Sequence, residues 1–225
     1  MTPAQFTHTL QLMDSLFPVG AFAYSDGLES AAASGCVRGP DSLAGWFEHY
    51  INAVFVPCDG LALLKCARAT ETMDWATVRS IDEELTALKP AAAVRASSAS
   101  IGKRFLATYS AILDGGGLLP SVESLPRCNA PVAYGIALSH LGLEPRDSLL
   151  AYGYGRMSGI LSAGLRLLPL GHQQGQVLLT EALDHLPGAV ERILSMEAEP
   201  LRAFSPLMDV HQMNHRYVYS RLFRS

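Results

Sequence analysis

Apolar residues recur through this chain with the spacing of an α-helix, and this periodicity most constrains how it can fold. Phe6, Leu10, Met13 and Phe17 are separated by four, three and four positions, which would place them on one face of a helix. The alternation of apolar and polar residues that is typical of a half-buried strand is hard to find. We therefore predict an all-α fold, a single-domain helical bundle of roughly eight to ten helices over residues 1–225.

Capping and turn-forming residues divide the helical pattern into segments. The first helix should end at Asp14 and Ser15, ahead of a turn at residues 18–20. Asp41 and Ser42 have the signature of an N-cap, so a second helix is expected to begin there. A glycine run at 115–117 predicts a break, and a helix should begin near Pro131, because proline is tolerated in the first turn.

Composition and charge exclude several classes of protein. The net charge is −4, whereas a general nucleic-acid binder usually presents a basic face. Only 17% of residues are charged, which suits either a protein that works inside a complex or a monomer with a large core. We expect no nucleic-acid partner.

The N-terminal region and the cysteines indicate where the protein works. No Lys or Arg precedes Arg38, so we expect no secretory signal with a basic start. The longest uncharged stretch, Cys128 to Leu143, is too short and too interrupted by proline and glycine to span a bilayer. The four cysteines form no C-x-x-C pair, and an intracellular chain would keep them reduced. We therefore predict a cytoplasmic protein with no membrane contact.

No complete catalytic motif is present. His211 and His215 are four positions apart, so on a helix they would project from one face and could share a metal ion. A zinc hydrolase would need glutamate at position 212, where this chain has Gln212, which cannot act as a general base. We predict no catalytic residue, no cofactor and no metal site. The alternative, a small helical metal-dependent hydrolase using His211 and His215, stays open.

Four blocks of sequence resemble the urease accessory protein F (UreF) family. Residues 14–29 follow the pattern D-S-x-F-P-x-G-x-F-x-x-S-x-G-L-E, with ten matching positions in sixteen. Residues 131–135 (PVAYG) resemble an H-P-V-A-F-G block, although Ala130 replaces the histidine. Residues 166–176 resemble R-L-x-P-L-G-Q-x-x-G-Q, with His172 in place of glutamine. The C-terminal ending also agrees, so the resemblance spans residues 10–225.

The resemblance implies a fold and a set of partners. The family is all-α and dimerises. It binds a second accessory protein, called UreD or UreH, recruits the GTPase UreG and docks on apo-urease for nickel insertion. It has no known catalytic residues of its own, so the resemblance implies a homodimeric, non-catalytic maturation factor that is a candidate for nickel binding.

Two segments are the candidate partner-binding sites, residues 1–30 and residues 204–225. The first forms a recognition segment that, with the block at 166–176, supplies these candidates for contact with UreG: Asp14, Ser15, Phe17, Tyr24, Ser25, Glu29, Arg166 and Gln176. The second is a tail that combines aromatic residues with arginine, the composition of binding hot spots. Its candidates for contact with UreD or UreH are Arg216, Tyr217, Ser220, Arg221, Leu222, Phe223 and Arg224.

Both assignments have an alternative. Asp14 and Ser15 could cap helix ends instead of contacting a partner. The tail could fold back on its own core.

Overall fold

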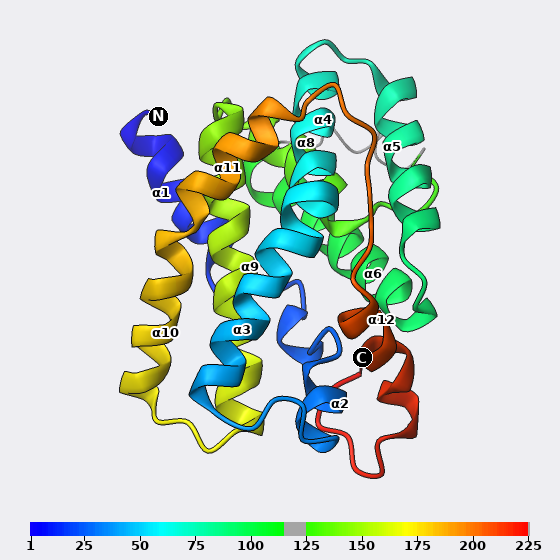
Figure 1. The fold of residues 1–225 in the computed structure, drawn as a ribbon. Coiled ribbons are helices and arrows are strands. Elements are labelled where there is room, and N and C mark those ends of the chain that lie inside the picture. Colours follow the sequence, from blue (N-terminus) through cyan, green and yellow to red (C-terminus); the bar gives the residue numbers. More distant parts are fainter. Residues whose placement is uncertain (115–124, 225) are drawn as a thin grey trace.

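Helices and loops make up all of the chain that the computed structural model describes, which is residues 1–114 and 125–224. No β-strand occurs in these ranges, so the all-α prediction is confirmed. The predicted glycine break at 115–117 lies outside the described residues. The α-helices are α1 (Pro3–Met13), α2 (Leu28–Ala33), α3 (Pro40–Tyr50), α4 (Gly60–Glu71), α5 (Trp75–Leu88), α6 (Ala92–Tyr109), α8 (Ala130–His140), α9 (Pro145–Leu167), α10 (His172–Asp184), α11 (Leu186–Ser195) and α12 (Pro206–Asn214) (Figure 1).

A long helix forms the centre of the bundle. α3, the π-helical segment η2 (Ile51–Asp59) and α4 run on from one another as a helix of 32 residues, Pro40–Glu71. It is long and apolar enough to cross a membrane by length and composition, but 72% of its apolar window is buried inside the protein. Pro57 lies within η2 and lacks the N–H that a regular helix would use there. π-helical turns inside α-helices are frequently found at functional sites.

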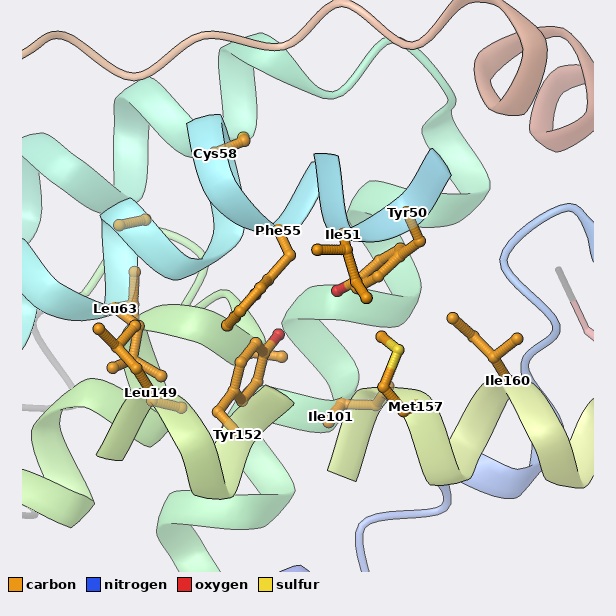
Figure 2. Close-up of a cluster of buried hydrophobic side chains, with 14 of the residues drawn as sticks. Tyr50, Ile51, Phe55, Cys58, Leu63, Ile101, Leu149, Tyr152, Met157 and Ile160 are labelled. Atoms are coloured by element: carbon orange, nitrogen blue, oxygen red, sulfur yellow. The ribbon is translucent and has the colours of Figure 1, made fainter. Parts of the chain in front are cut away.

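The core forms where this central helix meets α8 and α9. Figure 2 shows Phe55 of η2 pointing toward Tyr152 of α9, and their ring centroids lie 6.4 Å apart. Gly135 on α8 allows the close approach of α4, because a Cβ atom there would lie 2.8 Å from the carbonyl oxygen of Leu63. Nearly all buried apolar side chains of the described residues form one continuous cluster.

A buried carboxylate holds the start of α8. Asp82 of α5 is fully buried and accepts hydrogen bonds from the backbone N–H groups of Arg127 (2.9 Å), Cys128 (2.8 Å) and Asn129 (2.8 Å). The Asn129 side-chain amide donates a further bond of 2.7 Å. Asn129 is the N-cap of α8, which confirms the predicted helix start near Pro131.

The first helix forms and carries Phe6, Leu10 and Met13 at the predicted spacing, but this apolar face is largely uncovered. Phe6 and Leu10 are 50% and 55% exposed, whereas Leu12, on another face of α1, is buried. Phe17 is buried, but it lies beyond Met13, where the helix ends. α1 lies at the edge of the bundle and therefore leaves one apolar side uncovered.

The predicted N-cap of the second segment also needs correction. α3 begins at Pro40, so Asp41 and Ser42 lie in its first turn instead of before it. The Ser42 hydroxyl oxygen accepts the N–H groups of Arg38 (2.9 Å) and Gly39 (3.1 Å) and so caps the helix from within.

Candidate functional site

The two candidate segments, which lie at opposite ends of the sequence, meet around one buried carboxylate. Glu29, in the first turn of α2, is 3% exposed. Its carboxylate accepts the backbone N–H groups of Leu222 (2.5 Å) and Phe223 (3.3 Å). It also lies 2.6 Å from Nε2 of His215, which is buried as well. α2, α12 and the C-terminus accordingly lie together at the lower right of Figure 1. We call this contact region the junction.

Arg166, at the C-terminal end of α9, joins the same two segments. Its guanidinium carbon lies 4.1 Å from the centroid of the Phe223 ring, within range of a cation–π interaction. Its Nη1 donates a hydrogen bond of 2.8 Å to the carbonyl of Phe22. The backbone N–H of Arg224 donates to the carbonyl of Ala23 at 2.8 Å. The tail is therefore held by both backbone and side-chain contacts.

A glycine lets α12 approach the N-terminal segment. Gly27 has a φ of +93°, a conformation that residues with a side chain rarely adopt. A Cβ atom there would lie 3.0 Å from the backbone nitrogen of Gln212 on α12. Asp26 beside it also has a positive φ, of +50°, so the turn is shaped to receive the helix.

Charged groups that are buried (Asp59) or half-buried (Asp26, Lys89 and Arg156) lie beneath α12. Asp26 forms an ion pair with Arg156, whose Nε donates to the hydroxyl of Tyr50 at 2.9 Å. Tyr50 donates in turn to Asp59 (3.4 Å), and Lys89 pairs with Asp59 at 2.7 Å. Burial raises the pKa of Tyr50, although the Arg156 charge opposes the shift, so the phenol stays neutral. Two cations and two carboxylates therefore balance one another.

The charged network surrounds a cavity of about 40 Å³, which side chains of α12 help to line. Sequence reasoning did not find this network. One signal was available, because Arg156 is the lone charged residue in the otherwise uncharged stretch 148–165 of α9. A charge in such a stretch favours a buried ion pair.

The structure separates the predicted contact residues by accessibility. Asp14, Ser15, Arg166 and Gln176 are exposed, Tyr24 is half-buried, and Phe17, Ser25 and Glu29 are buried. In the tail, Arg216, Tyr217, Ser220, Arg221, Leu222 and Arg224 are exposed and Phe223 is buried. A surface contact through the four buried side chains does not fit this structure; Glu29 and Phe223 hold the junction instead. Contact through the exposed ones stays a prediction.

Two of the predicted residues behave differently from the rest. Asp14 ends α1, and its carboxylate accepts the N–H of Leu16 at 2.6 Å, as the helix-end alternative expects. Gln176 lies on α10, and none of the junction contacts described above involves it.

The histidine pair does not form a shared site. Nε2 of His215 is hydrogen-bonded to the carboxylate of Glu29, whereas the ring of His211 lies against that of Trp46, with centroids 6.1 Å apart. Burial lowers the pKa of His211. Within residues 1–114 and 125–224, no group of three or more His, Cys, Asp or Glu side chains could hold a metal ion. His215 therefore serves the junction, and the geometry gives the hydrolase alternative no support.

Comparison with known proteins gives the chain its family. The model of the UreF family matches residues 37–183. The chain belongs to the UreF family. It is 30% identical to the urease accessory protein UreF of Trichormus variabilis, over all of this chain and 98% of that protein. The UreF of Methylobacterium radiotolerans is 31% identical over the whole of both chains, and that of Microcystis aeruginosa is 32% identical over 96% of each.

The C-terminal segment of this UreF-family chain has two faces. Its inner face carries His215 and Phe223, which are held at the junction. Its outer face exposes large apolar side chains: Phe204, Leu207, Val210, Met213, Tyr217, Tyr219 and Leu222. Exposed arginines lie between them. The alternative that the tail folds back on its own core thus describes the inner face only.

Proposed function

We propose that this chain is a non-enzymatic urease maturation factor, a helical adaptor that binds UreD or UreH and recruits or regulates the GTPase UreG for nickel insertion into apo-urease. Membership of the UreF family supports the role in urease maturation, since the relatives are named urease accessory proteins. The observation that carries the proposal is the junction, which fixes an aromatic and arginine-rich tail with its apolar side outward.

The outer face of the tail has the properties of a protein-binding surface. Tyrosine and arginine dominate binding hot spots, and Tyr217, Tyr219 and Arg221 are all exposed here. A terminal segment is usually poorly ordered and would lose entropy on binding. Because Glu29 already holds the backbone of this tail and Arg166 its Phe223 ring, part of that ordering is complete before a partner arrives. We assign this face to UreD or UreH.

The N-terminal loop is the candidate surface for UreG. Residues 1–30 contain no arginine, so this loop cannot supply an arginine finger to the GTPase. Its action would instead be to hold one conformation of UreG, through the exposed Asp14 and Ser15 and the half-buried Tyr24.

The proposed setting is a homodimer in the cytoplasm. All four cysteines are free thiols, as expected in a reducing compartment. Light scattering of the purified chain would test the dimer: a single-chain mass at micromolar concentration would contradict it.

Co-purification with UreD or UreH tests the proposal. The full chain is compared with a chain truncated after Val218, which removes the last anchor contacts and Tyr219 and Leu222. We expect the full chain to bind and the truncated chain to lose binding. A matched pair separates the two faces: Tyr219→Ala with Leu222→Ala removes the outer face, whereas Phe223→Ala removes the anchor. Equal binding by all of these folded variants would overturn the assignment of the tail.

A further inference from the structure

A trough runs along the side of α3 and the beginning of η2, away from the junction. Two adjoining hollows of about 330 and 320 Å³ form it, and they share Glu48, Ile51 and His185. α10 forms the other wall of the first hollow and α11 that of the second. In Figure 1, α10 and α3 lie toward the left of the bundle, with α11 above them, whereas α5 and α12 lie on the right. We call this feature the acidic trough.

The charged side chains that line the trough are mostly acidic. Asp41, Glu48 and Glu181 line the trough and are exposed, and none of them has an ion-pair partner in the part of the chain that the structure describes. Arg192 is the one Lys or Arg among the described residues that line it, and its guanidinium already donates to the Asn52 side chain at 2.7 Å. The trough therefore attracts cationic groups.

Two glycines leave bare backbone in the walls of the trough. Gly45 lies in the middle of α3 and Gly188 in the first turn of α11, and a Cβ atom at either position would meet nothing within 4 Å. Glycine in a helix interior is less favourable than alanine. No contact within the described chain requires a glycine at the position of Gly45, so the fold alone does not explain it. A bare backbone at the edge of a trough allows a second backbone to come close.

We infer that the acidic trough binds a helix of a partner protein, one that presents small or apolar side chains flanked by Lys or Arg. The wall from Asp41 to Asn52 is about 16 Å long, which accommodates about three turns of helix. Ile51 and Leu178 give the trough an apolar floor. The inference rests on the proposed function, because the partner would be another component of the maturation assembly.

Charge argues against a second copy of this chain as the occupant. A two-fold dimer presents the same patch from both subunits. Pairing two troughs would bring six unpaired carboxylates together and offer only two arginines, both already bonded to asparagine. A cationic helix satisfies the same carboxylates without this repulsion.

Charge reversal tests the inference. Glu48→Lys with Glu181→Lys is compared with Glu83→Lys with Glu84→Lys, which makes the same change in charge on the exposed side of α5. The probes are purified UreD or UreH, purified UreG and purified apo-urease, each immobilised for biolayer interferometry at two salt concentrations. We expect the trough variant to lose about tenfold or more in affinity for one of these three, and the α5 variant to bind as the unmodified chain does.

The controls separate the two proposals. If the unmodified chain binds none of the three probes, the proposed function fails and the trough inference fails with it. If the unmodified chain binds and the trough variant binds equally well, only the trough inference is overturned. A trough variant that changes the chain from dimer to monomer in light scattering would show that a second copy occupies the trough, which also overturns it.

A second substitution tests the trough without changing charge. Gly45→Leu places a side chain in open space, so the melting temperature should stay the same or rise, since leucine favours a helix. We expect the same partner to lose about tenfold in affinity, because the new side chain fills the trough. Unchanged affinity for all three probes would contradict a helix in this position.

Discussion

Removing the Glu29 carboxylate should release the C-terminal tail while leaving the bundle folded. Glu29→Ala deletes the acceptor for the N–H groups of Leu222 and Phe223 and the partner of His215. A hydrogen bond to a charged group contributes about 1.5–3 kcal/mol. The free energies of three such bonds add up to more than the substitution can cost. Once the tail has detached, its polar groups bond to water, and no further free energy is lost. The loss is therefore limited to the free energy of docking.

We expect the free energy of tail opening to fall by about 3 kcal/mol, which corresponds to about a hundredfold in the opening equilibrium. Amide hydrogen exchange measured by NMR reports this directly at Leu222 and Phe223. Their protection should fall about a hundredfold in Glu29→Ala, whereas amides of the buried helix α4 should keep theirs. Glu29→Gln retains one acceptor oxygen and should give an intermediate loss, and Glu83→Ala on α5 serves as the surface control.

Two results would refute this reasoning. If Leu222 and Phe223 exchange at unmodified rates in Glu29→Ala, the carboxylate does not hold the tail. If every slowly exchanging amide loses the same protection, Glu29 supports the whole fold, and the tail is not a separate unit.

Further substitutions and a change of pH test the packing of the bundle. Gly27→Ala should lower the free energy of unfolding by about 1–3 kcal/mol in urea titrations, because of its positive φ and the adjacent α12 backbone, whereas Gly45→Ala should raise it by about 1 kcal/mol. Asp82→Ala leaves three backbone N–H groups without their acceptor and should lower it by about 3–5 kcal/mol, seen as a reduced melting temperature. Burial raises the pKa of Cys58 and Cys128 to about 12, from an ordinary value of 9.0. The unfolded chain therefore loses these protons first, and stability should fall between pH 9 and 12, by up to about 1.4 kcal/mol per pH unit for each thiol. Replacing both by alanine should make the slope shallower by that amount, while Cys66, whose pKa is also raised by burial, keeps its own contribution.

Sequence periodicity predicted the helices better than it predicted which side of each one is buried. On α5, Val78, Ile81 and Leu85 have the spacing of one helical face, and all three are buried. On α1 the residues of the predicted face share one side of the helix, but Phe6 and Leu10 are exposed. The difference is that α5 is polar on its other side, so only one of its faces can be the buried one. α1 carries apolar residues on more than one side, and only the position of its neighbours decides which are covered.

The junction shows what a local pattern cannot contain. Glu29 and Phe223 are separated by 194 positions, and no spacing rule connects them. Both segments are predicted from the sequence to bind partners, but as two independent sites for two partners. The network of Asp26, Arg156 and Tyr50 is similar, because the isolated charge of Arg156 marks one member but no spacing rule identifies its two partners.

Because both segments share Glu29, binding at one should change affinity at the other. A partner that binds only the docked tail stabilises the loop around Glu29, and a partner that prefers this loop conformation then binds more tightly, by the same factor in either order. The coupling cannot exceed the docking free energy, about 3 kcal/mol by the estimate above. Measuring the affinity for UreG with and without saturating UreD or UreH gives this factor. Glu29→Ala should bring it close to one, and a factor that survives the substitution would show that the coupling does not pass through the junction.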